Sequence, residues 1–244
     1  MNVSGSLFYL TKKVGKAIWD YRMLQEGDKV LIAVSGGKDS LSLLRIMKER
    51  TKFVPINYEI TACFVNMGFE WTNKNLLIEH FEKESVPYII APAPEGWKRE
   101  DPFDCFWCSW NRRKALFDLC HSAGYTKIVF AHHMDDIIET MLLNLFFQGE
   151  IGTMKPYQEM FDGELAIIRP LAYVEEKELA RLATVLELPV IPSECPNGKI
   201  SKRSLVKGVI DEMTKHNKNV KKNIFRSLQK IRKDYLLDAI ANSK

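Results

Sequence analysis

The sequence lacks the long hydrophobic runs of a membrane protein, and we do not expect its N-terminal region to be a signal peptide. No apolar stretch reaches the roughly 18 residues that a membrane-spanning helix needs. The N-terminal region mixes apolar side chains with Lys12, Lys13 and Lys16, a pattern typical of an amphipathic helix and unlike the continuous apolar core of a signal peptide. We therefore expect a cytoplasmic protein with no membrane partner.

Cysteine is scarce, and repeats are absent. The chain has five cysteines, an odd number, and no export signal is expected, so a disulfide framework is not predicted. Internal repeats and low-complexity segments are lacking as well. With 244 residues, 46% hydrophobic and 27% charged, the chain has the composition of one large globular domain, or of one domain with an elaboration.

Two common phosphate-binding motifs are also lacking. A Walker loop requires glycine five residues before the pair Gly37-Lys38, where Ile32 stands, and the dinucleotide fingerprint Gly-x-Gly-x-x-Gly does not occur. The sequence has instead Ser35-Gly-Gly-Lys-Asp-Ser40, between an apolar run at 30–34 and apolar residues at helical spacing. Such a turn presents backbone N–H groups and a helix dipole to an anion, and we predict phosphate. An ordinary glycine-containing turn is the alternative.

Apolar runs and helical patterns alternate along the chain. We predict strands at 30–34, 58–65, 88–90, 127–131 and 165–168, a loop at 148–163, and helices before residue 27, at about 73–84 and 109–122, after residue 136, and at 175–186. This alternation predicts an α/β fold, a doubly wound and mostly parallel sheet with N- and C-terminal helical additions. The expected parts are a helical segment (1–26), an α/β domain (27–192) and a basic helical segment (193–244).

Charge is distributed unevenly. Residues 199–244 contain 13 Lys and Arg but only 4 Asp and Glu, whereas the whole chain has a net charge of +4. On a helical wheel one face carries Ile224, Leu228, Ile231 and Tyr235, and the opposite face carries Lys222, Arg226, Lys230 and Lys233. We predict a docked helix whose outward basic stripe binds a polyanion. A solvated charged face is the alternative.

A second polar group, His132, Asp135 and Asp136, follows the strand predicted at 127–131. Taken alone, either aspartate is expected to cap the next helix. A zinc site on the adjacent histidines is not favoured, because neighbouring side chains on a strand point to opposite faces.

Cys105 and Cys108 precede the helix predicted at 109–122, and Cys195 lies far downstream. Two thiolates at this spacing can bind one metal or one edge of a cluster. Three cysteines suit a four-iron cluster with one open iron, because a structural zinc site uses four protein ligands. The spacing equally fits a redox pair and does not show that Cys195 joins it. We expect Cys63 and Cys120 to be small core residues.

The order of these motifs resembles a known group of enzymes. The run Ser35–Ser40 resembles the pyrophosphate loop of the PP-loop ATP-pyrophosphatase superfamily, and His132-x-x-Asp-Asp resembles its second signature, with Ala131 in place of glycine. With the three cysteines, Arg112-Arg113, and residues 168–177 and 189–192, the chain resembles the tRNA 2-thiocytidine synthetase family over roughly residues 22–230. A second cysteine often seen near Cys195 is missing, and so are the zinc-finger cysteines of the thiouridine-forming branch.

The resemblance implies the adenine nucleotide alpha-hydrolase-like fold and ATP-dependent thiolation of a tRNA pyrimidine, with cytidine as the predicted base and uridine as the alternative. It implies ATP, Mg²⁺ and a [4Fe-4S] cluster on Cys105, Cys108 and Cys195 as cofactors. Expected partners are tRNA and a sulfur donor such as a cysteine desulfurase or inorganic sulfide, and a homodimer is compatible with the sequence. A cluster-free PP-loop synthetase and a non-catalytic nucleotide-binding module with structural zinc are the competing interpretations.

The resemblance also implies site residues. Catalytic roles are expected for Asp39, Arg112 and Asp135, and tRNA binding for the basic stripe defined above. The predicted nucleotide-binding residues are Ala33, Val34, Ser35, Gly36, Gly37, Asp39, Ser40, Asn66, Ala131, His132 and Asp135.

Overall fold

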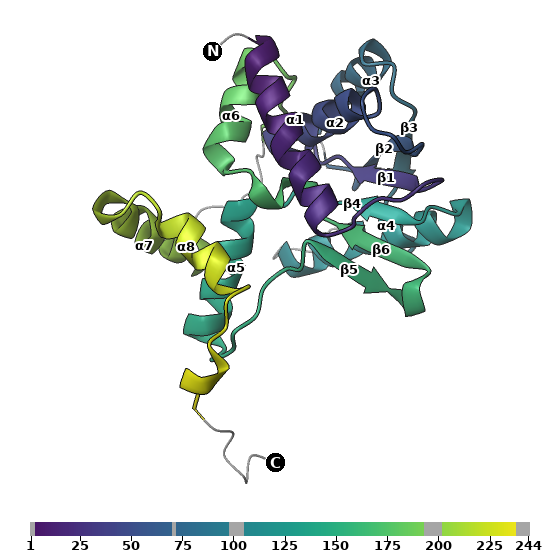
Figure 1. Ribbon diagram of the computed structural model, residues 1–244. Helices are drawn as coiled ribbons and strands as arrows, with labels where there is room; N and C mark the ends of the chain where they lie inside the picture. The colour runs from purple at the N-terminus through teal and green to yellow at the C-terminus, as the bar shows by residue number, and fades with distance from the viewer. Residues whose placement is uncertain (1–2, 70–71, 98–104, 193–201, 238–244) are drawn as a thin grey trace.

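A six-stranded sheet forms the centre of the protein (Figure 1). The computed structural model describes residues 3–69, 72–97, 105–192 and 202–237. Within them the strand order is β3-β2-β1-β4-β6-β5. The strands are β1 (Lys29–Ala33), β2 (Glu59–Asn66), β3 (Tyr88–Pro92), β4 (Lys127–Val129), β5 (Tyr157–Met160) and β6 (Leu165–Ile168). All neighbours are parallel except β5, which runs antiparallel to β6. The predicted doubly wound, mostly parallel sheet is confirmed.

Helices cover both faces of the sheet because β1 is apolar on both sides. Val30 and Ile32 belong to the hydrophobic core on one face, and Leu31 belongs to the core on the other. The first face is covered by α1 (Val3–Asp20), α2 (Lys38–Arg50), α3 (Lys74–Lys83) and α6 (Glu176–Val185). The second is covered by α4 (Cys105–Ala123). A central strand buried on both faces explains why its sequence is a continuous apolar run.

Two boundaries differ from those predicted. The segment predicted as a loop at 148–163 contains β5, whose sequence Tyr-Gln-Glu-Met is too polar to indicate a strand and which pairs with β6 only, at the edge of the sheet. In addition, α4 begins at Cys105 and not near residue 109. The Cys-x-x-Cys pair therefore forms the first turn of the helix.

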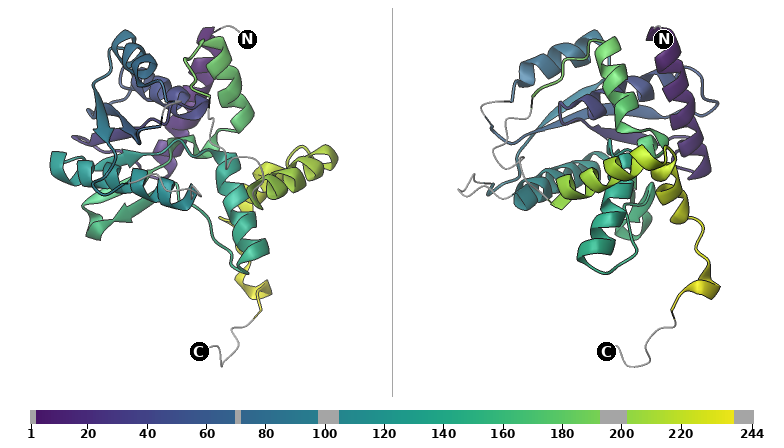
Figure 2. Two further views of the ribbon diagram at one scale, coloured as in Figure 1. Left: turned by 180° about the vertical axis from the view of Figure 1, so that it is seen from behind. Right: turned by 90° about the vertical axis from the view of Figure 1, so that its left-hand side faces the viewer.

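The C-terminal part is a helical unit docked on α5 (Met134–Phe147), on the side away from the sheet (Figure 2). It consists of α7 (Lys202–His216) and α8 (Val220–Ser227). Val206 and Ile210 of α7 and Phe225 of α8 are buried in one hydrophobic cluster with Ile138 of α5. Apolar burial on α5 thus holds this unit to the α/β domain.

The single helix predicted through Tyr235 is wrong, because α8 ends at Ser227. The side chains of Ile231 and Tyr235 are 54% and 76% exposed, so neither supplies the core contact that would stabilise further helical turns. Lys230 lies beyond the helix, and the side chain of Lys233 lies outside the described residues.

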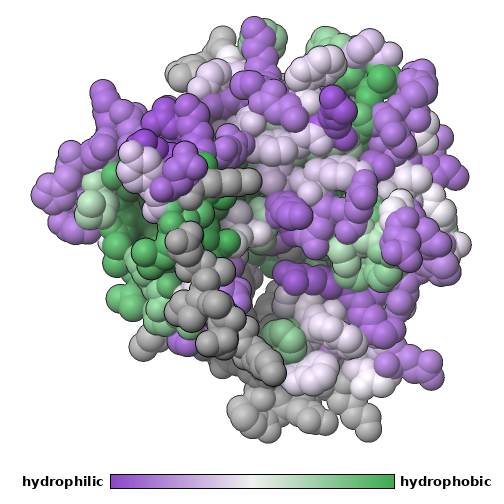
Figure 3. Space-filling view, turned by 60° about the horizontal axis from the view of Figure 1, so that its bottom comes forward, coloured by the Kyte–Doolittle hydropathy of each residue, from purple (hydrophilic) through white to green (hydrophobic). Residues whose placement is uncertain are grey.

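One side of the C-terminal unit remains apolar and exposed. Leu205, Val209 and Met213 recur at helical spacing on α7 and are 63%, 42% and 50% exposed. Figure 3 shows apolar side chains gathered on the side of the molecule that carries α5 and α7. Among the described helices, none is long and apolar enough to cross a membrane.

We expect Val206→Ala to lower the free energy of unfolding by about 2 kcal/mol or more, because it deletes two buried methyl groups and leaves a cavity between α7 and α5. Val209→Ala is the matched control. Its side chain lies on the exposed face of the same helix, so its effect should stay within about 0.5 kcal/mol. Denaturant titration followed by circular dichroism gives both values, and equal losses would contradict the described docking.

Candidate active site

The two polar motifs lie side by side because β1 and β4 are parallel neighbours in the sheet. Val30 pairs with Lys127 and Ile32 with Val129, so both strands end at the same edge. From β1 the chain proceeds to β2 on one side, and from β4 it proceeds to β5 and then β6 on the other. A reversal of strand order of this kind creates the crevice in which α/β proteins bind ligands.

The loop after β1 is a closed turn held by its own hydroxyl groups. Ser35 N–H donates to Ser40 Oγ at 3.1 Å, and Ser40 Oγ donates to the Gly37 carbonyl at 2.9 Å. Gly36 has φ of +85°, and a Cβ added there would lie 3.0 Å from Ile191 Cδ1. Gly37 caps α2 without a side-chain hydrogen bond, so the first-turn N–H groups of α2 face an anion site.

Asp39 carries a buried carboxylate oxygen that is left without a partner. Its Oδ2 pairs with Lys38 Nζ at 3.1 Å, whereas its Oδ1 is buried and has no hydrogen-bond partner among the described residues. Burial raises the pKa of Asp39 above its usual range, against the opposing effect of His133. A buried, unsatisfied carboxylate oxygen beside an anion site is a position at which a divalent cation would supply the missing partner.

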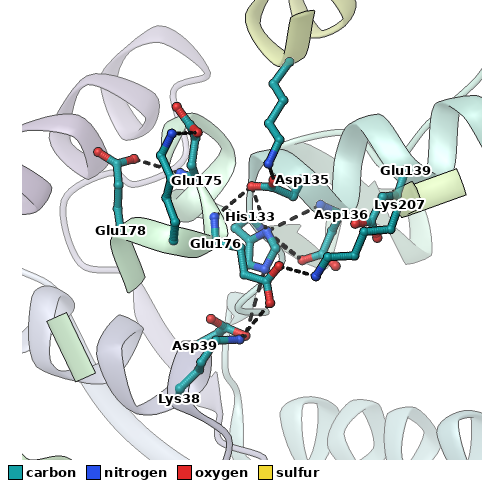
Figure 4. Close-up of polar contacts among 12 residues, drawn as sticks. Lys38, Asp39, His133, Asp135, Asp136, Glu139, Glu175, Glu176, Glu178 and Lys207 are labelled. Atoms are coloured by element: carbon teal, nitrogen blue, oxygen red, sulfur yellow. Dashed lines mark hydrogen bonds and ion pairs between the residues drawn. The ribbon is translucent and has the colours of Figure 1, made fainter. Parts of the chain in front are cut away.

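His133 connects the two motifs (Figure 4). It caps α5: its N–H donates to Asp136 Oδ2 at 2.9 Å, and the Asp136 N–H donates back to His133 Nδ1 at 3.4 Å. Its Nε2 lies 3.9 Å from Asp39 Oδ2. Asp136 therefore has the capping role expected of an aspartate here and also lines the cavity, whereas His133 was not among the predicted site residues.

The Asp135 side chain contacts α6 and α8. Its Oδ2 accepts the Glu176 N–H at 2.7 Å, at the start of α6, and its Oδ1 forms an ion pair with Lys221 of α8. The carboxylate is buried, and it is not among the described residues that line the cavity.

A chain of ion pairs runs from the glycine loop to the C-terminal unit. Lys38 Nζ lies 3.1 Å from Glu176, whose second oxygen lies 2.6 Å from Lys207 of α7. These two lysines, Lys207 first, lower the pKa of Glu176 to about 2. Arg203, one turn before Lys207, bonds Asp136 at 2.7 Å and Glu139 at 2.6 Å. Three basic residues of the C-terminal unit are thus engaged inside the site.

A cavity of about 520 Å³ opens between the glycine loop and α4. Its wall on α4 is formed by Cys108, Arg112 and Leu116, which recur every fourth residue on one helix face, and by Ser109 and Arg113 beside them. Eight of the predicted nucleotide-binding residues line it: Ala33, Val34, Ser35, Gly37, Asp39, Ser40, Ala131 and His132. Gly36 and Asn66 do not, and the Asn66 side chain accepts the Gly68 N–H at 3.1 Å.

The cysteines are described only in part. Cys108 is buried in the cavity wall, the side chain of Cys105 lies outside the described residues, and so does the whole of Cys195. The described side chains contain no group of three or more metal-binding residues. Cys63 lines the cavity, and burial raises the pKa of its thiol, like that of Cys120, to about 12. Both are core residues, as expected.

The wall around His132 is positively charged. Arg169 Nε lies 3.4 Å from His132 Nδ1, and burial together with this guanidinium lowers the pKa of His132 to about 4. Burial and the neighbouring Arg113 in turn lower the pKa of Arg169 to about 10. At neutral pH His132 is therefore neutral. Because its Nδ1 accepts from Arg169, its Nε2 carries the proton.

Comparison with known proteins agrees with this geometry. The family described as PP-loop domain matches residues 110–193. The tRNA-cytidine(32) 2-sulfurtransferase of Alcanivorax borkumensis is 34% identical over 240 residues, which are 94% of this chain and 83% of the relative. Its counterpart in Polaromonas naphthalenivorans is 35% identical over 94% of this chain and 75% of the relative.

Among solved structures, the fold is similar to that of a U34-tRNA thiolase from Methanococcus maripaludis, determined with its [4Fe-4S] cluster. The TM-score is 0.76 at 24% identity, over 93% of this chain and 78% of that chain. Since the likeness in sequence extends over most of both chains, and the PP-loop and the cysteine helix face one cavity, this chain belongs to the tRNA-cytidine(32) 2-sulfurtransferase family of PP-loop proteins.

Proposed function

We propose that this protein replaces the C2 oxygen of a tRNA cytidine by sulfur, in a reaction that converts ATP to AMP and pyrophosphate. The observation that carries the proposal is the cavity with a phosphate-binding loop on one wall and Cys108 with Arg112 on the other. Adenylation followed by thiolation requires that a nucleotide and a sulfur centre bind close to the same base, and one cavity lined by both motifs meets this requirement. The names of the relatives support cytidine as the base.

In the first half-reaction the C2 oxygen attacks the α-phosphorus of ATP, and pyrophosphate leaves. The hydroxyl groups of Ser35 and Ser40 and the N-terminus of α2 would bind the phosphates. Negative charge that develops on the phosphates in the transition state would be stabilised by these preorganised groups. Electrostatic stabilisation of this kind is usually the largest contribution to the rate of phosphoryl-type transfers. Arg112 faces the loop across the cavity and would neutralise part of this charge.

Asp39 is the residue that fits Mg²⁺, because its Oδ1 is buried and unsatisfied among the described groups. Bound there, the ion would screen the phosphate charges from each other. We assign Asp135 a positioning role, since its described contacts join α5, α6 and α8. Its contact with the nucleotide stays a prediction.

In the second half-reaction sulfur takes the place of the adenylated oxygen at C2, and AMP leaves. Cys105, Cys108 and Cys195 would hold a [4Fe-4S] cluster, since three thiolates leave one iron open to carry incoming sulfur. His132, neutral and protonated on Nε2, can donate a hydrogen bond into the cavity next to the reacting base.

The exposed Lys222 and Arg226 of α8 support tRNA binding. A cysteine desulfurase or sulfide as donor, and a homodimer, stay predictions.

The function is tested by incubating anaerobically purified protein with ATP, Mg²⁺, sulfide and unmodified tRNA, followed by mass spectrometry of the digested nucleosides. We expect 2-thiocytidine and AMP, and neither product when ATP is omitted. If 2-thiouridine appears instead, the assignment of the base is wrong. If no thionucleoside forms and ATP remains intact, the proposed reaction is wrong.

Cys108→Ser should lose most of the iron and acid-labile sulfide that the wild-type protein holds after anaerobic reconstitution, because one of three cluster ligands is removed. Cys120→Ser, in the same helix but within the core, should retain both. Full iron content in the Cys108 variant would contradict the proposed cluster. Zinc without iron in the wild-type protein would favour a structural metal instead.

Gly36→Ala should strongly reduce ATP consumption, because the left-handed backbone strains a residue with a Cβ and the added Cβ would lie only 3.0 Å from Ile191 Cδ1, so the loop must shift. Gly149→Ala is the control, because its φ is +69° but a Cβ there would meet no atom within 4 Å. Both variants should lose about 1–2 kcal/mol of stability from backbone strain. Only the Gly36 variant should lose nucleotide binding, measured by titration calorimetry, and equal affinities in the two variants would contradict the role of the loop.

A further inference from the structure

Three large aromatic side chains lie exposed at the N-terminal end of α4. Phe106 is 67% exposed, Trp107 55% and Trp110 46%. The ring centroids of Phe106 and Trp107 are 6.0 Å apart, and those of Trp107 and Trp110 are 5.6 Å apart, with the rings nearly perpendicular in both pairs. We call these residues the α4 aromatic ridge. Rings of this size usually bury most of their surface, so a continuous exposed group of three indicates a binding surface.

The ridge lies within one helical turn of the cavity wall. Cys108 and Arg112 face the cavity, and the helical rotation of about 100° per residue places residues 106, 107 and 110 on a different side of α4. The core contacts of α4 come from Cys108, Leu116 and Cys120, and none of the three ridge residues belongs to that cluster. The ridge is therefore not needed to pack α4 on the sheet, and it flanks the site of the proposed chemistry.

We propose that the α4 aromatic ridge stacks unpaired RNA bases that neighbour the base being modified. This inference rests on the proposed function. A base that enters the cavity leaves its stack, which costs free energy, and its neighbours lose a stacking partner. Aromatic rings on the protein replace that partner for any base, because every base has a π-face. Trp and Phe side chains have only two rotatable bonds and lose little conformational entropy on binding.

The charges beside the ridge favour RNA over a protein as its occupant. Arg112, Arg113 and Lys114 follow Trp110 within four residues, the two arginines on the adjoining cavity wall, and the first acidic residue within α4 is Asp118, which pairs with Lys114 at 2.7 Å. Within α4, the turn that follows the ridge is thus basic, as a surface next to a phosphate backbone should be. Stacking on protein rings requires unpaired bases, so the ridge should distinguish a single-stranded loop from a duplex.

The test compares wild type with the double variant Trp107→Ala, Trp110→Ala. The probes are a fluorescent RNA hairpin whose loop contains cytidines and a fully paired duplex of the same composition, and affinity is measured by fluorescence anisotropy at fixed salt. We expect the double variant to bind the hairpin at least about tenfold more weakly, equivalent to ~1.4 kcal/mol. Its duplex affinity should be unchanged. The double variant Trp107→Phe, Trp110→Phe should retain most of the hairpin affinity because it keeps aromatic faces.

Trp19→Ala is the matched control, because Trp19 is 82% exposed but belongs to α1, on the other face of the sheet. It should bind both RNAs like wild type. Equal hairpin affinity in wild type and the alanine double variant, or no preference of wild type for the hairpin, would overturn the inference. A third outcome would also overturn the inference. If the alanine double variant binds both RNAs like wild type but fails to thiolate when a protein supplies the sulfur, while still thiolating with sulfide, the ridge binds the donor protein and not RNA.

Thiolation by the wild-type protein, measured in parallel, separates this inference from the proposed function. Ridge-dependent hairpin binding without any thionucleoside would refute the proposed reaction and support the ridge as an RNA surface. Thiolation by wild type with unchanged binding and turnover in the alanine double variant would refute the ridge alone.

Discussion

The pairing of β1 with β4 is the constraint on which the site depends. Parallel neighbours end at the same edge of a sheet, and here the chain leaves these two strands in opposite directions. The glycine loop after β1 and the histidine–aspartate turn after β4 therefore meet, and His133 comes within 3.9 Å of Asp39. Neither motif could form half of a nucleotide site if another strand lay between β1 and β4.

The C-terminal unit stabilises this arrangement through ion pairs with acidic residues around the site. Arg203 and Lys221 neutralise Asp136 and Asp135, and Lys207 adds to the pairing of Glu176 with Lys38, so that less negative charge is left next to the phosphate-binding loop. The excess of basic residues in this segment thus serves two purposes. Part of it stabilises the site from within, and part of it, such as Lys222 and Arg226, remains exposed.

Local signals explain what the sequence could predict. The apolar run of β1, the glycines after it and the spacing of Cys105 and Cys108 can each be recognised from neighbouring residues. The strand patterns and the glycines predicted the sheet and the loop, whereas the sequence did not predict that α4 begins at Cys105 or that it lies across a cavity from the loop. The ion pair of Lys38 with Glu176 joins residues far apart in sequence, and only the folded sheet and α6 bring them together. The end of α8 at Ser227 depends on which side chains find a core to pack against, and a helical wheel carries no information on that.

Burial also keeps two cysteines of this chain unreactive. The nucleophilic form of cysteine is the thiolate, and Cys63 and Cys120, with pKa values of about 12, remain protonated at neutral pH. Cys63 borders the same cavity as Cys108, in which the proposed reaction would bring activated sulfur to the base. As a protonated thiol it is a poor acceptor. In the proposed reaction, the apolar packing behind β2 would thereby keep sulfur from being transferred to Cys63.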